Sequence, residues 1–203
     1  MISSPIQFYL ASRSPRRVEL LSQLAYTFET LSVDVCEQVK GGENPVEFVK
    51  RVATEKAQAG LEQMKNKSLP VLGADTIVYC DDRIMGKPRD QEEAMHMLTA
   101  LSGCAHRVYT AVAVCSALGC SVVLSESEVS MRKISTGEMS QYWLTGEPLD
   151  KAGGYAVQGL AAIFINNIRG SYSGIMGLPL FETAELLKDY NVVSPILSGC
   201  RGN

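Results

Sequence analysis

The alternation of apolar and polar positions along the chain predicts strands and helices in turn. Phe8-Tyr9-Leu10-Ala11 is a short apolar run typical of a buried strand. Ser14-Pro15 then predicts the start of a helix, because serine is favoured at the N-cap and proline at the first helical position. A second strand is expected over 28–33. Asn44-Pro45-Val46-Glu47 has the form of a capping box and predicts a long helix that runs to about Met64.

The same alternation continues to the C-terminus. An apolar strand is expected over 69–79, and Asp81-Asp82 predicts a tight turn into a partner strand at 83–85. The remaining elements expected are, in chain order, a helix opened by 90–93 and ended by 102–103, a hairpin of 107–115 and 121–131, a helix from 135 to about 146, a glycine-rich loop, one or two strands, and a helix over 179–190.

The expected fold class is therefore α/β, with a mixed central sheet flanked by helices. A chain of 203 residues can form one domain with a full core, or two lobes around a ligand-binding cleft. No repeat or linker divides it, so we expect a single domain over 1–203. Residues 1–7 are expected to be an N-terminal extension and 195–203 a frayed tail.

Composition and charge narrow the class of protein. Hydrophobic residues make up 46% and charged residues 20%, as in ordinary globular proteins. The net charge of -3 argues against a partner that is a nucleic acid polymer, but leaves room for a small polyanion held by local cations. No apolar run approaches the roughly 20 residues that span a bilayer, and the first residues lack the pattern of a signal peptide. We expect a cytoplasmic protein without a membrane partner.

The cysteines and histidines give no metal-binding pattern. The six cysteines are scattered and include no C-x-x-C pair. Their even number leaves disulfides open, but in a cytoplasmic chain we expect them to be reduced. Two histidines, His96 and His106, are too few for a His-rich zinc site.

Three cationic side chains occupy positions where cations are disfavoured. Arg16 and Arg17 fall in the first turn of a predicted helix, where backbone N–H groups attract anions and repel cations. They indicate either a bound phosphate or two solvated arginines on a surface turn. Lys56 falls on the apolar stripe of the helix after Asn44. It either directs its charge into a cleft or snorkels, with its stem buried and its amine in water.

Asp75 is the most informative position. It lies within Val71-Leu72-Gly73-Ala74-Asp75-Thr76-Ile77-Val78, a strand that is apolar on both faces and therefore expected to be central. A carboxylate there is costly unless a cation, a metal or strong hydrogen bonds compensate. Gly73 and Ala74 leave room for a ligand to approach the backbone. The alternative is a structural aspartate paired with an arginine, but we favour a functional site.

Further candidates lie in loops. Lys87 follows a strand in Gly86-Lys87-Pro88, and the proline holds it extended, so it is either a ligand contact at the end of the sheet or a solvated turn residue. Glu37 becomes a candidate metal ligand only if folding brings it near Asp75. Gln158, in a glycine-rich segment, has the donor and acceptor groups needed to read the edge of a base; the alternative is an ordinary flexible connection.

Three common motifs are absent from the sequence. It contains neither the G-x-x-x-x-G-K-[ST] loop nor the G-x-G-x-x-G fingerprint, which disfavours P-loop and Rossmann proteins. It also lacks G-x-S-x-G, although Gly170-Ser171-Tyr172-Ser173-Gly174 comes close, which disfavours a serine hydrolase.

Taken together, the motifs resemble the Maf family of nucleotide pyrophosphatases, also called septum-formation inhibitor-like proteins. The resemblance runs in order from about Tyr9 to Tyr190, and an ordered series is far more specific than one motif. The matching stretches are Ser12-Arg13-Ser14-Pro15-Arg16-Arg17 with Glu19-Leu20-Leu21, Glu55-Lys56-Ala57, Gly73-Ala74-Asp75-Thr76, Gly86-Lys87-Pro88-Arg89-Asp90, Leu101-Ser102-Gly103, Asp150-Lys151-Ala152-Gly153, Gln158-Gly159 and Gly177-Leu178-Pro179.

The resemblance implies hydrolysis of nucleoside triphosphates to the monophosphate and pyrophosphate with Mg²⁺ or Mn²⁺. Within the family, the chain is similar to the branch that acts on dTTP, UTP and modified pyrimidine nucleotides. The roles implied are proton acceptor for Asp75, substrate selection for Arg16, Thr76 and Gln158, phosphate contact for Ser12, Arg16, Arg17, Lys56 and Lys87, and metal binding for Glu37 and Asp75. The alternative is a non-catalytic nucleotide-binding regulator of cell division. A homodimer is left open.

Overall fold

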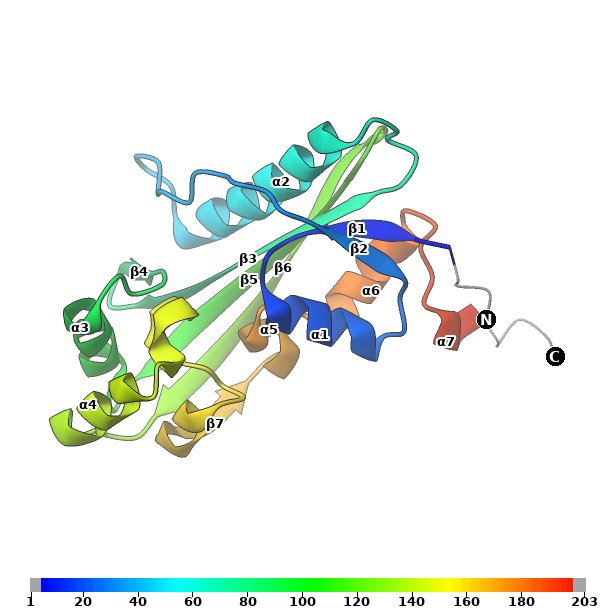
Figure 1. Cartoon of the computed structure of the whole chain (residues 1–203). Helices are drawn as coiled ribbons and strands as arrows, with labels where there is room; N and C mark the ends of the chain where they lie inside the picture. The colour runs from blue at the N-terminus through cyan, green and yellow to red at the C-terminus, as the bar shows by residue number, and fades with distance from the viewer. Residues whose placement is uncertain (1–4, 199–203) are drawn as a thin grey trace. The chain divides into compact units, whose positions relative to one another are not determined.

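The computed structural model describes residues 5–198, in which strands and helices alternate (Figure 1). The strands are β1 (Phe8–Ala11), β2 (Phe28–Leu31), β3 (Val71–Cys80), β4 (Arg83–Met85), β5 (Ala105–Ser116), β6 (Gly119–Met131) and β7 (Ile165–Arg169). The α-helices are α1 (Pro15–Gln23), α2 (Pro45–Gln63), α3 (Gln91–Leu101), α4 (Thr136–Leu144), α5 (Tyr172–Met176), α6 (Leu180–Lys188) and α7 (Pro195–Ser198). Three 3₁₀ helices, η1 (Glu147–Asp150), η2 (Ala152–Gly154) and η3 (Leu160–Phe164), lie between α4 and β7.

The strands form one mixed sheet in the order β2-β1-β3-β5-β6-β7, with β4 paired to β3. β1 is parallel to both β2 and β3, whereas β3 with β4 and β6 with β7 are antiparallel. The predicted α/β class with a mixed central sheet is confirmed. β3 lies between β1 and β5, and eight of its ten residues are buried, which explains why its sequence is apolar on both faces.

The contacts between residues divide the chain into two compact units. Within the described residues, the first contains 5–75, 110–124 and 177–198. In this unit α2 packs on β1 and β3 through Gly60, because a Cβ there would lie 2.8 Å from Val71 and 3.0 Å from Ala11. In Figure 1, α1 and α6 lie on the other side of these strands from α2.

The second unit contains 76–109 and 125–176 and has its own apolar core. α3, α4 and the segment that follows α4 all contribute buried side chains to it. Its larger members are Val78, Met85, Met97, Leu98, Leu101, Val108, Val129, Met131, Ile134, Met139, Tyr142, Tyr155, Val157, Phe164 and Ile175. Tyr155 and Val157 are therefore core residues, although they belong to the glycine-rich segment that was expected to be a loop.

Several boundaries differ from the sequence-based expectations. β2 ends at Leu31 rather than at 33, and the expected glycine-rich loop contains η1 and η2. The short helix α5 was not anticipated. Residues 195–198 form α7, while the rest of the expected frayed tail lies outside the described residues. Gln7, at the end of the expected N-terminal extension, is tied to the fold because its side-chain amide donates to the Val193 carbonyl at 2.9 Å.

The expectation of reduced cysteines is wrong for one pair. Cys115, at the end of β5, is disulfide-bonded to Cys120, at the start of β6, and their Cα atoms are 4.1 Å apart. The turn between the two strands brings these residues opposite each other, within bonding reach. Cys36, Cys80 and Cys104 are free thiols, and Cys200 lies outside the described residues. Between residues 5 and 198, no helix is long and apolar enough to cross a bilayer.

Candidate active site

A cluster of three charged side chains occupies the first unit. The Lys56 Nζ atom on α2 lies 2.7 Å from Asp75 Oδ1 on β3 and 2.6 Å from Glu37 Oε1 in the loop after β2. The side chains of Asp75 and Lys56 are 10% and 12% exposed, and that of Glu37 is 51% exposed. The ammonium group therefore joins two carboxylates and does not snorkel to water. Because Glu37 is half exposed, the ion pair is not closed off from solvent.

Burial changes the protonation chemistry of Asp75. Loss of hydration raises the pKa of its carboxyl group, while the positive charges of Lys56 and Arg17 act to lower it. A carboxylate whose pKa is raised binds a proton more readily than an exposed aspartate does. The sequence-based view of Asp75 as a compensated buried carboxylate in a central strand is thus confirmed. Lys56 is its ion-pair partner, and Arg17 adds a second positive charge nearby.

Arg17 adds a second buried cation to the unit. Its Nε atom donates to the Gly177 carbonyl at 2.8 Å, and its Nη1 atom donates to Ser12 Oγ at 3.2 Å. Burial lowers the pKa of the Arg17 guanidinium, and the negative charge of Asp75 opposes this effect. Arg17 is therefore not a solvated surface arginine. Arg16, its neighbour in the first turn of α1, is half-buried.

Gly73 allows close packing of a helix on the sheet, and not the approach of a ligand that the sequence suggested. A Cβ at this position would lie 2.4 Å from the Ala53 carbonyl oxygen and 2.5 Å from the Ala57 backbone nitrogen, both on α2. The missing side chain thus lets α2 pack directly on β3, and does not leave room for a ligand. This close contact brings Lys56, which precedes Ala57, next to Asp75.

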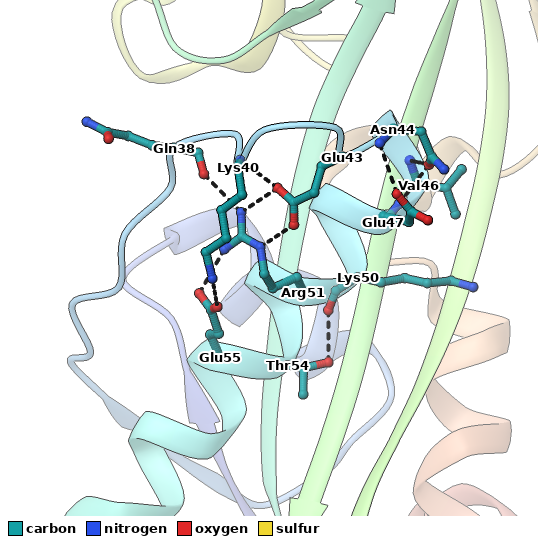
Figure 2. A network of polar contacts seen from close by, with 10 residues as sticks. All are labelled: Gln38, Lys40, Glu43, Asn44, Val46, Glu47, Lys50, Arg51, Thr54 and Glu55. Carbon is teal, nitrogen blue, oxygen red and sulfur yellow. Dashed lines mark hydrogen bonds and ion pairs between the residues drawn. The ribbon is translucent and has the colours of Figure 1, made fainter.

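A polar network fixes the loop that carries Glu37 (Figure 2). Arg51 on α2 pairs with both carboxylate oxygens of Glu43, with Glu55 at 3.0 Å, and with the Gln38 carbonyl at 2.9 Å. The hydrogen bond from Arg51 lowers the pKa of Glu43 to about 2. Since Gln38 follows Glu37 directly, Arg51 ties the Glu37 loop to the helix that bears Lys56.

Sequence reasoning missed the role of Arg51. The i, i+4 spacing of Arg51 and Glu55 was a signal for a helix-surface ion pair. It could not reveal Glu43 or the Gln38 carbonyl, because these contacts depend on how the loop folds back onto α2.

Glu37 and Asp75 are the two carboxylates that could hold a metal ion beside Lys56. Among residues 5–198, no group of three or more His, Cys, Asp or Glu side chains could hold a metal without other ligands. Mg²⁺ is commonly bound through one or two carboxylates together with substrate phosphates and water. Glu37 and Asp75, which converge on one cation, fit this kind of site.

The other predicted residues lie in the second unit. Thr76 is half-buried in β3, Lys87 is exposed after β4, and Gln158 is exposed between η2 and η3. The segment that carries Lys87 is hydrogen-bonded to the glycine-rich segment that precedes Gln158, because the Gly153 backbone nitrogen donates to the Gly86 carbonyl at 2.9 Å. The roles of Thr76, Lys87 and Gln158 stay predictions.

An α/β fold in which a buried aspartate shares a lysine with a second carboxylate, beside a buried arginine, is a candidate phosphate-handling enzyme. The chain belongs to the Maf family, since the family model described as "Maf-like protein" matches residues 7–190. Its relatives include three proteins named dTTP/UTP pyrophosphatase. That of Saccharophagus degradans is 51% identical over 186 residues, covering 91% of this chain and 89% of the relative. Those of Alkalilimnicola ehrlichii and Methylobacillus flagellatus are each 47% identical, covering 91% and 93% of this chain and 93% and 95% of the relatives.

Proposed function

We propose that this protein hydrolyses dTTP, UTP and modified pyrimidine nucleoside triphosphates to the monophosphate and pyrophosphate. The observation that carries the proposal is the cluster of Asp75, Lys56 and Glu37, with Arg17 buried nearby. The names of the relatives support the choice of substrates.

The reaction requires a proton acceptor and neutralised phosphate charge. A water oxygen attacks the α-phosphorus, the bond from that phosphorus to the bridging oxygen breaks, and pyrophosphate leaves with the electron pair. Asp75 takes the proton from the attacking water. Lys56 and Arg17 balance the charge that develops on the phosphate oxygens, because cations fixed before the reaction need no reorganisation.

The remaining phosphate and base contacts are assigned by the family resemblance. Ser12, Arg16 and Lys87 contact phosphate oxygens, and Arg16, Thr76 and Gln158 select the pyrimidine substrate. Exposed Gln158 offers an amide donor and an acceptor to the edge of a base.

The proposal includes a divalent cation, Mg²⁺ or Mn²⁺, held by Glu37 and Asp75 together with the substrate phosphates. When bound, it supplies positive charge to the phosphate oxygens and fixes their orientation. In this arrangement Lys56 contacts a phosphate oxygen of the substrate in addition to the carboxylates of Glu37 and Asp75.

A turnover screen tests the proposal. The protein is incubated with UTP, dTTP, CTP and GTP, each with Mg²⁺ and with excess EDTA, and the products are separated by anion-exchange chromatography. We expect UMP or dTMP with pyrophosphate in equal amounts, faster turnover of UTP and dTTP than of GTP, and no turnover in EDTA. Nucleotide binding without product would instead favour the regulator, and release of inorganic phosphate with a diphosphate would contradict the bond assigned.

A further inference from the structure

Gln158 is exposed at the end of a buried stretch of the second unit. Tyr155, Ala156 and Val157 before it are each 5% exposed, and Tyr155 and Val157 belong to the core. Because the residues before it are buried, the exposed Gln158 side chain can keep one orientation. The anchors next to Gln158 therefore determine how well it can recognise a ligand.

One carboxylate holds the chain just after Gln158. Glu147 Oε2 accepts a hydrogen bond from the Leu160 backbone nitrogen at 2.8 Å, and Oε1 accepts one from that of Ala161 at 3.2 Å. The Tyr142 hydroxyl donates to Glu147 Oε1 at 2.7 Å. Hydrogen bonds to a charged acceptor are stronger than those between neutral groups.

The same pair of side chains also holds the chain before Gln158. The Tyr142 hydroxyl oxygen accepts a hydrogen bond from the Ala156 backbone nitrogen at 3.3 Å. Burial, with the hydrogen bond to Glu147, raises the pKa of Tyr142, so the hydroxyl keeps its proton. Glu147 thus fixes residues on both sides of Gln158, directly on one side and through Tyr142 on the other.

Gly159 provides the space for this carboxylate. A Cβ at Gly159 would lie 2.3 Å from Glu147 Oε2 and 2.5 Å from its Cδ atom. The backbone itself does not require glycine, because its φ of -111° is open to any residue. Alanine at this position would therefore displace the Glu147 carboxylate without straining the chain.

The start of the segment is held separately. The Tyr155 hydroxyl lies 2.8 Å from His106 Nε2, and the two rings pack edge to face with centroids 5.4 Å apart. These contacts do not involve Glu147. A change at Glu147 should consequently loosen residues 156–161 while leaving Tyr155 in the core.

We propose that Glu147 is a positioning residue for base selection, which holds Gln158 in the orientation that reads the pyrimidine. This inference rests on the proposed function, in which Gln158 contacts the base. Loss of the Glu147 contacts then weakens recognition of the nucleoside half of the substrate and leaves recognition of pyrophosphate intact.

Two variants and a matched control test this inference. Glu147→Gln keeps the shape but places an amide N–H group where a carboxylate oxygen accepted a hydrogen bond, and Gly159→Ala displaces the carboxylate. Glu138→Gln is the control, because it makes the same Glu-to-Gln change in the same unit and removes the ion pair with Arg132 without touching 156–161. Inhibition of UTP turnover by UMP and by inorganic pyrophosphate is measured separately, along with the rate ratio of UTP to GTP and the thermal midpoint.

We expect both test variants to raise the inhibition constant of UMP about tenfold, the upper end for loss of one neutral hydrogen bond between Gln158 and the base. That of pyrophosphate should change less than about twofold, the UTP-to-GTP ratio should fall about fivefold, and kcat should stay within about threefold. Adding Gly159→Ala to Glu147→Gln should cause little further loss, because both changes disrupt the same contact.

The outcomes separate this inference from the proposed function. Equal weakening of UMP and pyrophosphate, no change in either, or the same pattern in Glu138→Gln would overturn the role of Glu147 while UTP turnover by the wild type stands. If Glu147→Gln does not fold, Gly159→Ala decides between these results. A wild type that releases no pyrophosphate from any nucleotide overturns the proposed function, and this inference with it.

Discussion

Charges of both signs are gathered around Asp75. Glu37 and Asp75 share Lys56, and the negative charge of Asp75 also acts on Arg17, which in turn is repelled by the positive charge of Arg16. In the proposed reaction a triphosphate brings several further negative charges to this cluster. Additional positive charge is then needed, which is consistent with the divalent ion and the phosphate contacts that the family resemblance implies.

At the residue scale, sequence reasoning succeeded where a side chain conflicts with its local surroundings. Asp75 and Lys56 were found because a charge in an apolar strand or stripe requires a partner. Glu37 could be assigned only conditionally, since its place depends on a loop. Arg51 was missed and Gly73 was misinterpreted for the same reason, because their contacts come from tertiary packing that local spacing does not show.

His106 provides a prediction about stability and pH. Burial lowers the pKa of His106 to about 4 from 6.5. The unfolded chain therefore binds the proton first as the pH falls, so the contribution of neutral His106 is present above about pH 6.5 and is lost on acidification toward pH 4. Between about pH 7.5 and pH 5 the expected loss in unfolding free energy from this group is about 2 kcal/mol.

Urea unfolding of the wild type and of His106→Gln at the two pH values checks this prediction. The variant should lose about 2 kcal/mol less than the wild type over this interval, whatever its stability at pH 7.5. Equal losses in the two proteins would show that His106 does not titrate as its burial implies.

At the element scale, helix boundaries followed local chemistry. α2 begins with the expected capping box of Asn44 and Glu47, and α4 begins with one of Ser135 and Glu138. These signals were readable because each lies within four consecutive residues. The 3₁₀ helices and α5 were not readable. η3, for example, begins where Glu147 accepts hydrogen bonds from the backbone, a contact from 13 residues away.

Gly73→Ala tests the packing of α2 on β3. The new Cβ would contact backbone atoms of Ala53 and Ala57, which cannot rotate away, so α2 must shift. We expect a loss of about 3 kcal/mol in unfolding free energy, typical of severe overpacking. Turnover of UTP should also fall at temperatures where the variant is folded, because the shift moves Lys56 from Asp75.

Gly137→Ala is the matched control for this change. Gly137 lies in the first turn of α4, and a Cβ there meets no other atom within 4 Å. Chemical denaturation should show that this variant is as stable as the wild type or slightly more so. A Gly73→Ala variant of unchanged stability would contradict the close packing of α2 on β3.

At the scale of the whole molecule, the family motifs are divided between the two units. Asp75 ends a segment of the first unit and Thr76 begins the second, while Lys87 and Gln158 belong to the second. The order of the motifs along the chain was enough to recognise the family, and the match over 7–190 confirms it. The order of the motifs does not give the distances between them, however. The contacts of Lys56 with Glu37 and Asp75 could therefore be identified only from the structure.

A ligand that binds the folded protein should raise its thermal stability. With a non-hydrolysable α,β-methylene analogue of UTP and Mg²⁺, at about 100 times Kd, the stabilisation is about 2.7 kcal/mol. This corresponds to a rise in Tm of roughly 5–10 °C for a chain of this size. Differential scanning calorimetry should show a much smaller rise with the analogue in EDTA. Equal shifts with and without Mg²⁺ would contradict a metal that binds together with the phosphates.

The most direct measurement concerns Asp75 itself. Pyrophosphate release from UTP is compared for the wild type, Asp75→Asn, and Asp189→Asn, which changes an exposed carboxylate after α6. We predict that Asp75→Asn lowers kcat by about 10³-fold, the effect of losing a proton acceptor, while the α,β-methylene analogue still binds, more weakly than to the wild type because Asp75 also helps to hold the metal ion. Asp189→Asn should match the wild type. An Asp75→Asn protein that releases pyrophosphate at the wild-type rate would contradict the central claim.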